Sequence, residues 1–248
     1  MSTYGLIGYP LGHSFSKLYF TEKFNKENIN SIYNLFPIEN INLVSDLISS
    51  NLDLRGFNVT IPYKEQIIPF LDEVEKEASA IGAVNVVKII ERDGKRILKG
   101  YNSDIYGFYE SIRPLIKTCH KKALILGTGG ASKAIAAMLR KLNIIYTFVS
   151  RSAKDGQLSY LDIDAQIMKE YTVIINCSPV GMSPNVDEAP MLPYEYFTDE
   201  HIAYDLVYNP LETKFLKLAK EHGATTKNGL EMLYLQAERA WSIWQKEE

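Results

Sequence analysis

The spacing of hydrophobic residues changes abruptly in the middle of the chain. Residues 123–126 form a short apolar run without a polar face, which is typical of a strand buried on both sides of a parallel sheet. Apolar residues then recur at helical spacing over residues 131–142, on one stripe of an amphipathic helix. Gly127, Gly129 and Gly130 lie between the two patterns. The pattern therefore predicts a strand, a glycine turn and a helix.

Similar alternation runs through the rest of the chain. It predicts two α/β units, because both the first hundred residues and the region after them alternate strand-like and helix-like segments. The Asp93-Gly94 pair predicts a hairpin. Strands are expected at 4–7, 31–38, 56–61, 83–90, 96–101, 123–126, 144–149, 172–176 and 202–207, and helices at 18–24, 41–48, 64–71, 73–81, 104–115, 131–142, 213–222 and 230–244.

The glycine turn is a candidate anion site. Backbone N–H groups at a helix N-terminus and the helix dipole favour the same negatively charged ligand, and glycines let the main chain approach a pyrophosphate closely. The third position of the G-x-G-x-x-G pattern is Ser132, which is small enough for close packing. An ordinary strand-to-helix turn is the alternative. The flanking strand and helix favour a dinucleotide site that uses Gly127, Gly129, Gly130 and Ala131.

The next predicted strand ends in Ser150-Arg151-Ser152, with Lys154 shortly after. An NAD enzyme usually places a carboxylate near this position to bind the ribose hydroxyl groups, whereas an arginine suits a 2′-phosphate. These four residues therefore indicate NADP.

Composition excludes several other classes of protein. The 248 residues are 46% hydrophobic and 23% charged, as in an ordinary globular protein. A net charge of −3 gives no general attraction to nucleic acid or to anionic membranes. Two cysteines cannot make a disulfide framework, and the four histidines lack metal-ligand spacing, so we expect a cytoplasmic protein without a metal site. The sequence also shows neither a signal segment nor a membrane-spanning run.

Several polar residues have both a structural and a functional interpretation. Ser14 and Ser16 precede or begin a predicted helix, where a serine caps free N–H groups or helps to hold a carboxylate. Thr60 lies at the carboxyl end of a predicted strand and Lys64 in the turn after it, at the edge where α/β sheets bind ligands, although Lys64 is also compatible with a solvated surface position. Asp104 begins a helix and could simply complement its dipole.

Taken together, these motifs resemble the shikimate dehydrogenase family, which includes shikimate and quinate dehydrogenases. The resemblance runs nearly end to end, and the order and spacing of the motifs are more specific than any one of them. They are HSFS at 13–16, NVTIPYK at 58–64, GAVN at 82–85, GYNSD at 100–104, GTGGAS at 127–132, SRS at 150–152, NCSPVGM at 176–182, DLVYNP at 205–210 and NGLEMLYLQA at 228–237.

The resemblance implies an α/β fold of two domains, with the active site in the cleft between them. Residues 1–101 and 228–248 would form a discontinuous substrate-binding domain, and residues 102–227 a Rossmann-like NADP-binding domain. In the family, paired serines bind the substrate carboxylate, three polar positions hold the ring hydroxyls, a tyrosine lies near the carboxylate, and a lysine and an aspartate are catalytic. These roles fall on Ser14 and Ser16, on Thr60, Asn85 and Gln236, on Tyr208, and on Lys64 and Asp104.

Three departures from the family pattern leave the substrate preference and the strictness of NADP use open. Lys17 replaces the usual proline, Val86 a threonine and Ser150 an asparagine. The resemblance implies reversible NADP-dependent reduction of 3-dehydroshikimate to shikimate, in the pathway to chorismate and aromatic amino acids, by a monomer or homodimer. A quinate/shikimate dehydrogenase that uses NAD or NADP is one alternative. A non-catalytic NADP-binding sensor is another, and the presence of both Lys64 and Asp104 argues against it.

Overall fold

The computed structural model describes residues 1–12 and 14–247, so His13 of the HSFS motif lies outside the described residues. The chain divides into two compact units. Met1–Ser103 and the segment that starts at Ala237 form the first unit, and Asp104–Gln236 form the second. The chain returns to the first unit within the last helix, whereas the sequence placed this return at residue 228.

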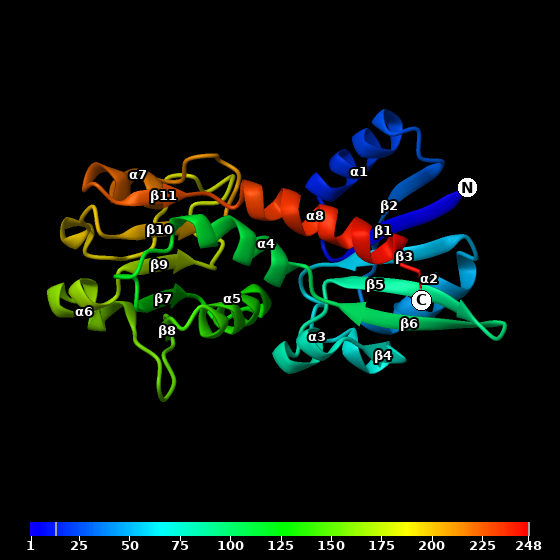
Figure 1. The fold of residues 1–248 in the computed structure, drawn as a ribbon, viewed down its shortest axis with the longest axis horizontal. Helices are drawn as coiled ribbons and strands as arrows, with labels where there is room; N and C mark the ends of the chain where they lie inside the picture. The colour runs from blue at the N-terminus through cyan, green and yellow to red at the C-terminus, as the bar shows by residue number, and fades with distance from the viewer. Residues whose placement is uncertain (13, 248) are drawn as a thin grey trace. The chain divides into compact units, whose positions relative to one another are not determined.

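The first unit is built on a six-stranded mixed sheet in the order β2-β1-β3-β5-β6-β4 (Figure 1). β1 is parallel to β2 and β3, and β5 is antiparallel to both β3 and β6. The hairpin between β5 and β6 turns at Asp93 and Gly94, as expected. The strands are β1 (Ser2–Gly8), β2 (Ser31–Pro37), β3 (Leu54–Val59), β4 (Glu73–Val74), β5 (Val86–Arg92) and β6 (Lys95–Tyr101).

Helices cover both faces of this sheet. On one face, α2 (Val44–Ser50) and α3 (Lys76–Ile81) contribute to a core with Phe57 of β3. On the other face, α1 (Phe15–Lys26) and the end of α8 (Leu230–Gln245) pack in an aromatic cluster with Tyr4 and Tyr33. The indole N–H of Trp244 donates a hydrogen bond of 3.0 Å to the carbonyl of Val87, which fixes the end of α8 to β5.

The helix expected over residues 64–71 is wrong. This segment consists of turns followed by one 3-10 turn, η2 (Ile68–Phe70). Pro69 has no backbone N–H, and its ring obstructs the preceding turn of an α-helix, so an α-helix from residue 64 cannot continue through it. The helix expected at 73–81 starts later, because Glu73 and Val74 pair with β6 as strand β4.

The second unit contains a five-stranded parallel sheet in the order β11-β10-β9-β7-β8. The buried strand predicted at 123–126 is confirmed, since these four side chains are fully buried. The strands are β7 (Lys122–Leu126), β8 (Ile145–Val149), β9 (Val173–Asn176), β10 (Ile202–Asp205) and β11 (Thr225–Lys227). This all-parallel sheet with crossover helices confirms the expected Rossmann-like α/β architecture.

Helices also cover this sheet on both sides. α4 (Asp104–Ile112) packs against β10, where Phe108 and Tyr204 make an edge-to-face contact at 5.2 Å. α5 (Gly130–Lys141) follows β7 and packs beside α4. α6 (Ala165–Glu170) and α7 (Lys214–Glu221) contribute Met168 and Phe215 to the core on the other face. The sequence did not predict the short elements α6 and β11. Single-turn 3-10 helices also occur in both units. One is at Ile41–Leu43 in the first unit, and the second unit has them at Arg113–Leu115, Tyr160–Asp162 and Tyr194–Tyr196.

Candidate active site

The glycine turn connects β7 to α5 as the sequence predicts. Gly127 has a φ of +103°, in the left-handed region that disfavours side chains, and its N–H donates to the carbonyl of Val149 at 2.9 Å. Gly129 is the N-cap of α5, and no described side chain caps this helix. A Cβ atom added at Gly129 would meet no atom within 4 Å. The turn therefore offers open space beside N–H groups that point along the helix axis.

This turn lies at the position where parallel sheets of this type bind dinucleotides. From β7 the chain crosses to β8 on one side, and β9 lies on the other side, so the carboxyl end of β7 is a topological switch point. Ser132 is buried, and its hydroxyl donates to the carbonyl of Gly129 at 2.6 Å, so it packs at the third fingerprint position as expected. Gly130 and Ala131 form the first turn of α5. These residues fit the diphosphate of a dinucleotide.

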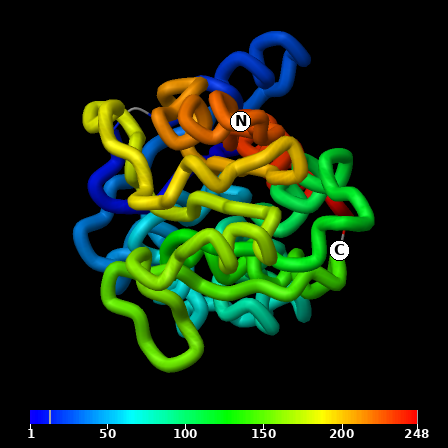
Figure 2. The backbone as a smooth tube through the Cα atoms, turned by 90° about the vertical axis from the view of Figure 1, so that its left-hand side faces the viewer, coloured from blue at the N-terminus to red at the C-terminus, as the bar shows by residue number. Residues whose placement is uncertain are grey.

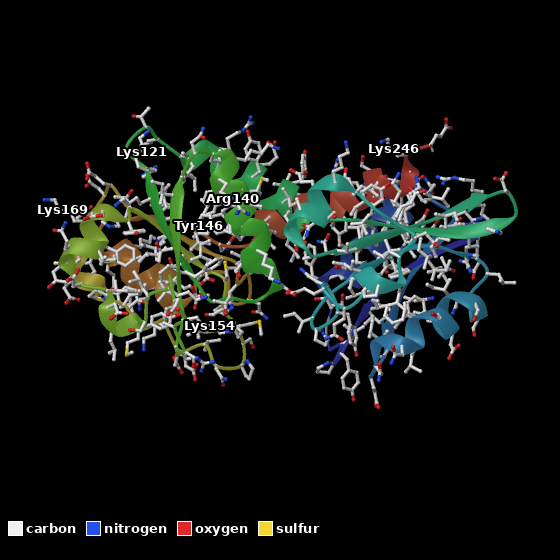
Figure 3. All side chains as sticks on the ribbon, turned by 90° about the horizontal axis from the view of Figure 1, so that it is seen from below. Lys121, Arg140, Tyr146, Lys154, Lys169 and Lys246 are labelled. Carbon is white, nitrogen blue, oxygen red and sulfur yellow. The ribbon has the colours of Figure 1, made fainter. Side chains whose placement is uncertain are left out.

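An exposed loop follows β8 and carries the predicted phosphate-binding side chains. Two backbone hydrogen bonds of 2.9 Å, from Ser150 to Leu158 and from Leu158 to Phe148, close the loop at its base. Arg151, Ser152 and Lys154 are exposed on it, and Ser150 is half-buried. The loop projects from the second unit in Figures 1 and 2, and Lys154 is labelled on it in Figure 3.

The loop carries both basic and acidic side chains that bear on cofactor choice. Burial raises the pKa of Tyr160, and the nearby positive charge of Arg151 opposes that rise. The guanidinium of Arg151 therefore lies near Tyr160, which follows the loop. Asp155 is also exposed on the loop. A 2′-phosphate would find a cation here, and a ribose hydroxyl would find a carboxylate.

In the first unit, Ser14 and Ser16 differ in their surroundings. Ser14 is the N-cap of α1, and its hydroxyl accepts a long hydrogen bond of 3.4 Å from the N–H of Lys17. The capping interpretation of Ser14 therefore holds, although the bond is weak. Ser16 lies in the first turn of α1, near Tyr33: burial raises the pKa of Tyr33, and the Ser16 hydroxyl opposes that rise.

Tyr33 begins a chain of hydrogen bonds that leads to Asn85, a second predicted substrate residue. The Tyr33 hydroxyl donates a hydrogen bond of 2.7 Å to Oδ1 of Asn58, and Nδ2 of Asn58 donates to the carbonyl of Asn85 at 3.2 Å. The side chain of Asn85 accepts a bond of 2.7 Å from the N–H of Ser103. The first unit thus joins Tyr33, Asn58 and Asn85 in one hydrogen-bond network, and Ser16 lies near its Tyr33 end.

Thr60 directly follows β3, and Lys64 lies in the turns that replace the expected helix. The N–H of Thr60 donates to the carbonyl of Ile7 at 2.9 Å, and the carbonyl of Lys64 accepts from the N–H of Val84 at 2.7 Å. Lys64 is half-buried. Backbone bonds on both sides therefore fix the main chain from which the ammonium group extends.

The second unit contains Asp104, Tyr208 and Gln236. Asp104 is the first residue of α4 and is buried, with 3% of its surface exposed. One turn later, a Cβ atom at Gly107 would lie 2.6 Å from the carbonyl oxygen of Met232 and 3.3 Å from Cβ of Gln236. Only glycine permits this approach, so α4 and α8 pack closely at Gln236. Tyr208 follows β10, and burial raises its pKa.

The predicted substrate and catalytic residues therefore divide between the two units. The first unit contains Ser14, Ser16, Thr60, Lys64 and Asn85, and the second contains Asp104, Tyr208, Gln236 and all the predicted cofactor residues.

Two buried polar residues in the second unit were missed from the sequence. Asn176 and Asp205 end the neighbouring strands β9 and β10, and Nδ2 of Asn176 donates to Oδ1 of Asp205 at 2.9 Å. The signal was present, because each is a polar residue that ends an otherwise apolar run. In the sequence, Asn176 and Asp205 were recognised only as the first residues of the motifs NCSPVGM and DLVYNP.

The described residues contain no group of three or more His, Cys, Asp or Glu side chains arranged to hold a metal ion. Cys119 is exposed and Cys177 half-buried, and both are free thiols. Within the described part of the chain, none of the helices has the length and apolar character needed to cross a membrane.

Comparison with known proteins agrees with these features. Residues 6–87 match the model of the shikimate dehydrogenase substrate binding domain. The chain is 39% identical to the shikimate dehydrogenase (NADP(+)) of Methanococcus vannielii, over 97% of this chain and 90% of that protein. A crystal structure of a shikimate dehydrogenase in complex with NADP+ superposes with a TM-score of 0.85 at 36% identity, covering 100% of this chain and 91% of the other.

A further structure gives a complex with both ligands. The shikimate 5-dehydrogenase of Thermus thermophilus, solved with NADP(H) and shikimate, has a TM-score of 0.85 and 30% identity, and the match covers 99% of this chain and 94% of that one. Identity of 39% over nearly the full length of both proteins goes well beyond a shared fold. The chain belongs to the shikimate dehydrogenase family.

Proposed function

We propose that this chain is an NADP-dependent shikimate dehydrogenase, which reversibly reduces 3-dehydroshikimate to shikimate. The observation that carries the proposal is the uncapped N-terminus of α5 beside the open space at Gly129, at the switch point of the sheet. Arg151 follows the adjacent strand β8. The names of the relatives supply the substrate.

We assign most of the substrate-binding residues to the first unit, with Tyr208 and Gln236 from the second, and cofactor binding to the second unit. The match of residues 6–87 to a substrate-binding domain supports the first assignment. The parallel sheet and its glycine turn support the second. Gly127, Gly129, Gly130 and Ala131 would bind the diphosphate, and Ser150, Arg151, Ser152 and Lys154 the 2′-phosphate.

The chemistry requires a proton donor close to the reacting carbonyl. The nicotinamide of NADPH supplies the hydride. Negative charge develops on the carbonyl oxygen as the carbon is reduced, and the ammonium group of Lys64 would stabilise this charge and supply the proton. In the reverse direction the same nitrogen accepts the proton of the alcohol. The carboxylate of Asp104 would orient Lys64 and a neighbouring hydroxyl.

The remaining polar residues would hold the ring in one orientation. Ser14 and Ser16 would donate hydrogen bonds to the substrate carboxylate, with Tyr208 nearby. Thr60, Asn85 and Gln236 would bind the ring hydroxyls. The network through Tyr33 and Asn58 supports this arrangement, because it holds the main chain at Asn85 and Ser16 lies near its Tyr33 end. Orientation of this kind lowers the entropic part of the barrier.

We further propose that the enzyme works in the cytoplasm as a monomer or homodimer. Both cysteines are free thiols, as expected in a reducing compartment. Size-exclusion chromatography with light scattering would determine the oligomeric state.

The test measures turnover and cofactor binding together. Purified protein is assayed with shikimate or quinate and with NADP or NAD, by nicotinamide absorbance, and NADPH binding is measured by calorimetry. We expect the highest kcat/KM with shikimate and NADP. Comparable rates with quinate or NAD would favour a quinate/shikimate dehydrogenase instead. NADPH binding without turnover in any combination would indicate a sensor.

A further inference from the structure

Asp205 is a buried acceptor of three hydrogen bonds. It ends strand β10, at the carboxyl edge of the parallel sheet, and its side chain is fully buried. Its Oδ1 accepts bonds from Nδ2 of Asn176 at 2.9 Å and from the N–H of Val207 at 3.0 Å. Its Oδ2 accepts a bond of 2.6 Å from the hydroxyl of Thr213. The mechanism proposed above gives this carboxylate no role in catalysis or in ligand binding.

The bond to Asn176 leads to the segment that follows β9. Nδ2 of the Asn176 amide donates to Asp205, so Oδ1 of the same amide faces away from Asp205 and accepts hydrogen bonds from Ser178. This oxygen accepts from the N–H of Ser178 at 3.0 Å and from the hydroxyl of Ser178 at 2.6 Å. Nδ2 of Asn176 also donates to the carbonyl of Val180 at 3.3 Å. Asp205 therefore determines which way the amide of Asn176 faces, and the amide holds Ser178.

Ser178 lies against the glycine turn. A Cβ atom at Gly127 would lie 3.4 Å from the backbone nitrogen of Ser178, which is van der Waals contact. The preceding N–H, of Cys177, donates to the carbonyl of Leu126 at 2.9 Å. The segment after β9 is thus one side of the switch point, and the turn after β7 is the other.

We propose that Asp205 is a positioning residue for the dinucleotide: through Asn176 and Ser178 it holds the segment after β9 against the glycine turn that binds the diphosphate. This inference rests on the proposed function, because it presumes that the turn binds NADP. Asp205 and Asn176 are both fully buried, so neither contacts a ligand directly. Their effect on the cofactor is exerted through backbone geometry.

The two sides of the carboxylate allow a matched set of variants. Asp205→Ala removes all three bonds. Asp205→Asn is the conservative variant, because its amide oxygen can still accept from Asn176 and Val207 while its nitrogen donates to the Thr213 hydroxyl. Ser178→Ala removes the 2.6 Å bond to Asn176 on the cofactor side, together with the weak 3.4 Å bond that the hydroxyl accepts from the N–H of Val180. Thr213→Ala removes the bond on the opposite side, together with the side-chain cap of α7, and leaves the Asn176 side intact.

The experiment titrates NADPH into each folded protein and measures Kd by calorimetry, with KM for shikimate measured at saturating NADP. We expect Asp205→Ala to raise Kd about tenfold and Ser178→Ala about threefold, as for loss of buried hydrogen bonds. Asp205→Asn and Thr213→Ala should stay within about twofold of the wild type, although Thr213→Ala melts at a lower temperature. KM for shikimate should change less than Kd for NADPH in every variant.

Three results would overturn the inference. One is wild-type Kd in both Asp205→Ala and Ser178→Ala. Another is a loss in Thr213→Ala as large as that in Asp205→Ala, since a general loss of stability would then explain both. The third applies if Asp205→Ala does not fold: a wild-type Kd for NADPH in Ser178→Ala then overturns the inference by itself. Failure of the wild type to bind NADPH would instead overturn the proposed function, and this inference with it.

Discussion

The hydroxyl of Thr213 donates a 2.6 Å hydrogen bond to Asp205, and both residues are fully buried. Burial disfavours the ionised carboxylate and outweighs the three hydrogen bonds that favour it, so the pKa of Asp205 rises from its ordinary value of 3.8 to about 6. Burial also raises the pKa of two neighbouring groups, the Cys177 thiol and the Tyr194 hydroxyl, and the negative charge of Asp205 adds to both rises.

The raised pKa of Asp205 predicts a pH dependence of stability. Between pH of about 4 and about 6 the folded protein binds more protons at this site than the unfolded chain, so this group contributes less stability as pH rises. The full effect is on the order of 3 kcal/mol. Asp205→Asn can keep three hydrogen bonds, with the direction of the Thr213 bond reversed, and it cannot titrate. Denaturant unfolding should show the wild type losing stability relative to Asp205→Asn as pH rises from about 4 to about 7. If the free energies of unfolding of the wild type and Asp205→Asn instead change in parallel with pH, the pKa of Asp205 is not raised.

Ser14 and Ser16 are expected to act mainly in substrate binding. The double variant Ser14→Ala, Ser16→Ala should raise KM for shikimate about tenfold or more, because hydrogen bonds to a charged carboxylate are lost. The kcat should fall much less, since this carboxylate does not react. Asp164→Ala is the control, because it removes the N-cap of α6. If the double variant only melts at a lower temperature, as the control should, while KM stays normal, the two serines act as capping residues alone.

Arg151 is expected to select NADP over NAD. A guanidinium can make two charge-assisted hydrogen bonds to a phosphate, so Arg151→Ala should raise KM for NADP at least about tenfold. KM for NAD should change little. Arg140→Ala is the control, because Arg140 is also exposed in this unit and lies 5.8 Å from the centre of the Tyr146 ring (Figure 3). An equal loss with both cofactors would mean that Arg151 supports the fold or the diphosphate instead.

The sequence predicted the second unit's central elements well because their patterns are unambiguous. A fully apolar run followed by glycines and a helical stripe specifies β7, the turn and α5 without tertiary information. The helix predicted at 64–71 was wrong. Its apolar residues have helical spacing, but Pro69 prevents an α-helix there. The short elements α6 and β11 were missed, since their few residues carry little periodicity.

The candidate site was predictable only in part. Family motifs include Ser16, Asn58 and Asn85, but they identify neither Tyr33 nor the hydrogen bonds that lead from Tyr33 through Asn58 to Asn85. Such links depend on which faces of neighbouring strands meet, and this depends on register. The same holds for Asp205, whose partners Asn176 and Thr213 come from another strand and from the start of a helix.

The most direct measurement is the initial rate of NADP reduction by shikimate for the wild type, Lys64→Ala and Lys95→Ala. Lys95 is the control because it is an exposed lysine beside the β5–β6 hairpin. The wild type and Lys95→Ala should turn over at similar rates. Lys64→Ala should lose about a hundredfold or more in kcat, as for a positioned acid–base group, with a much smaller change in shikimate affinity. A wild type without turnover would contradict the proposed reaction, and near-normal kcat in Lys64→Ala would remove Lys64 from the mechanism.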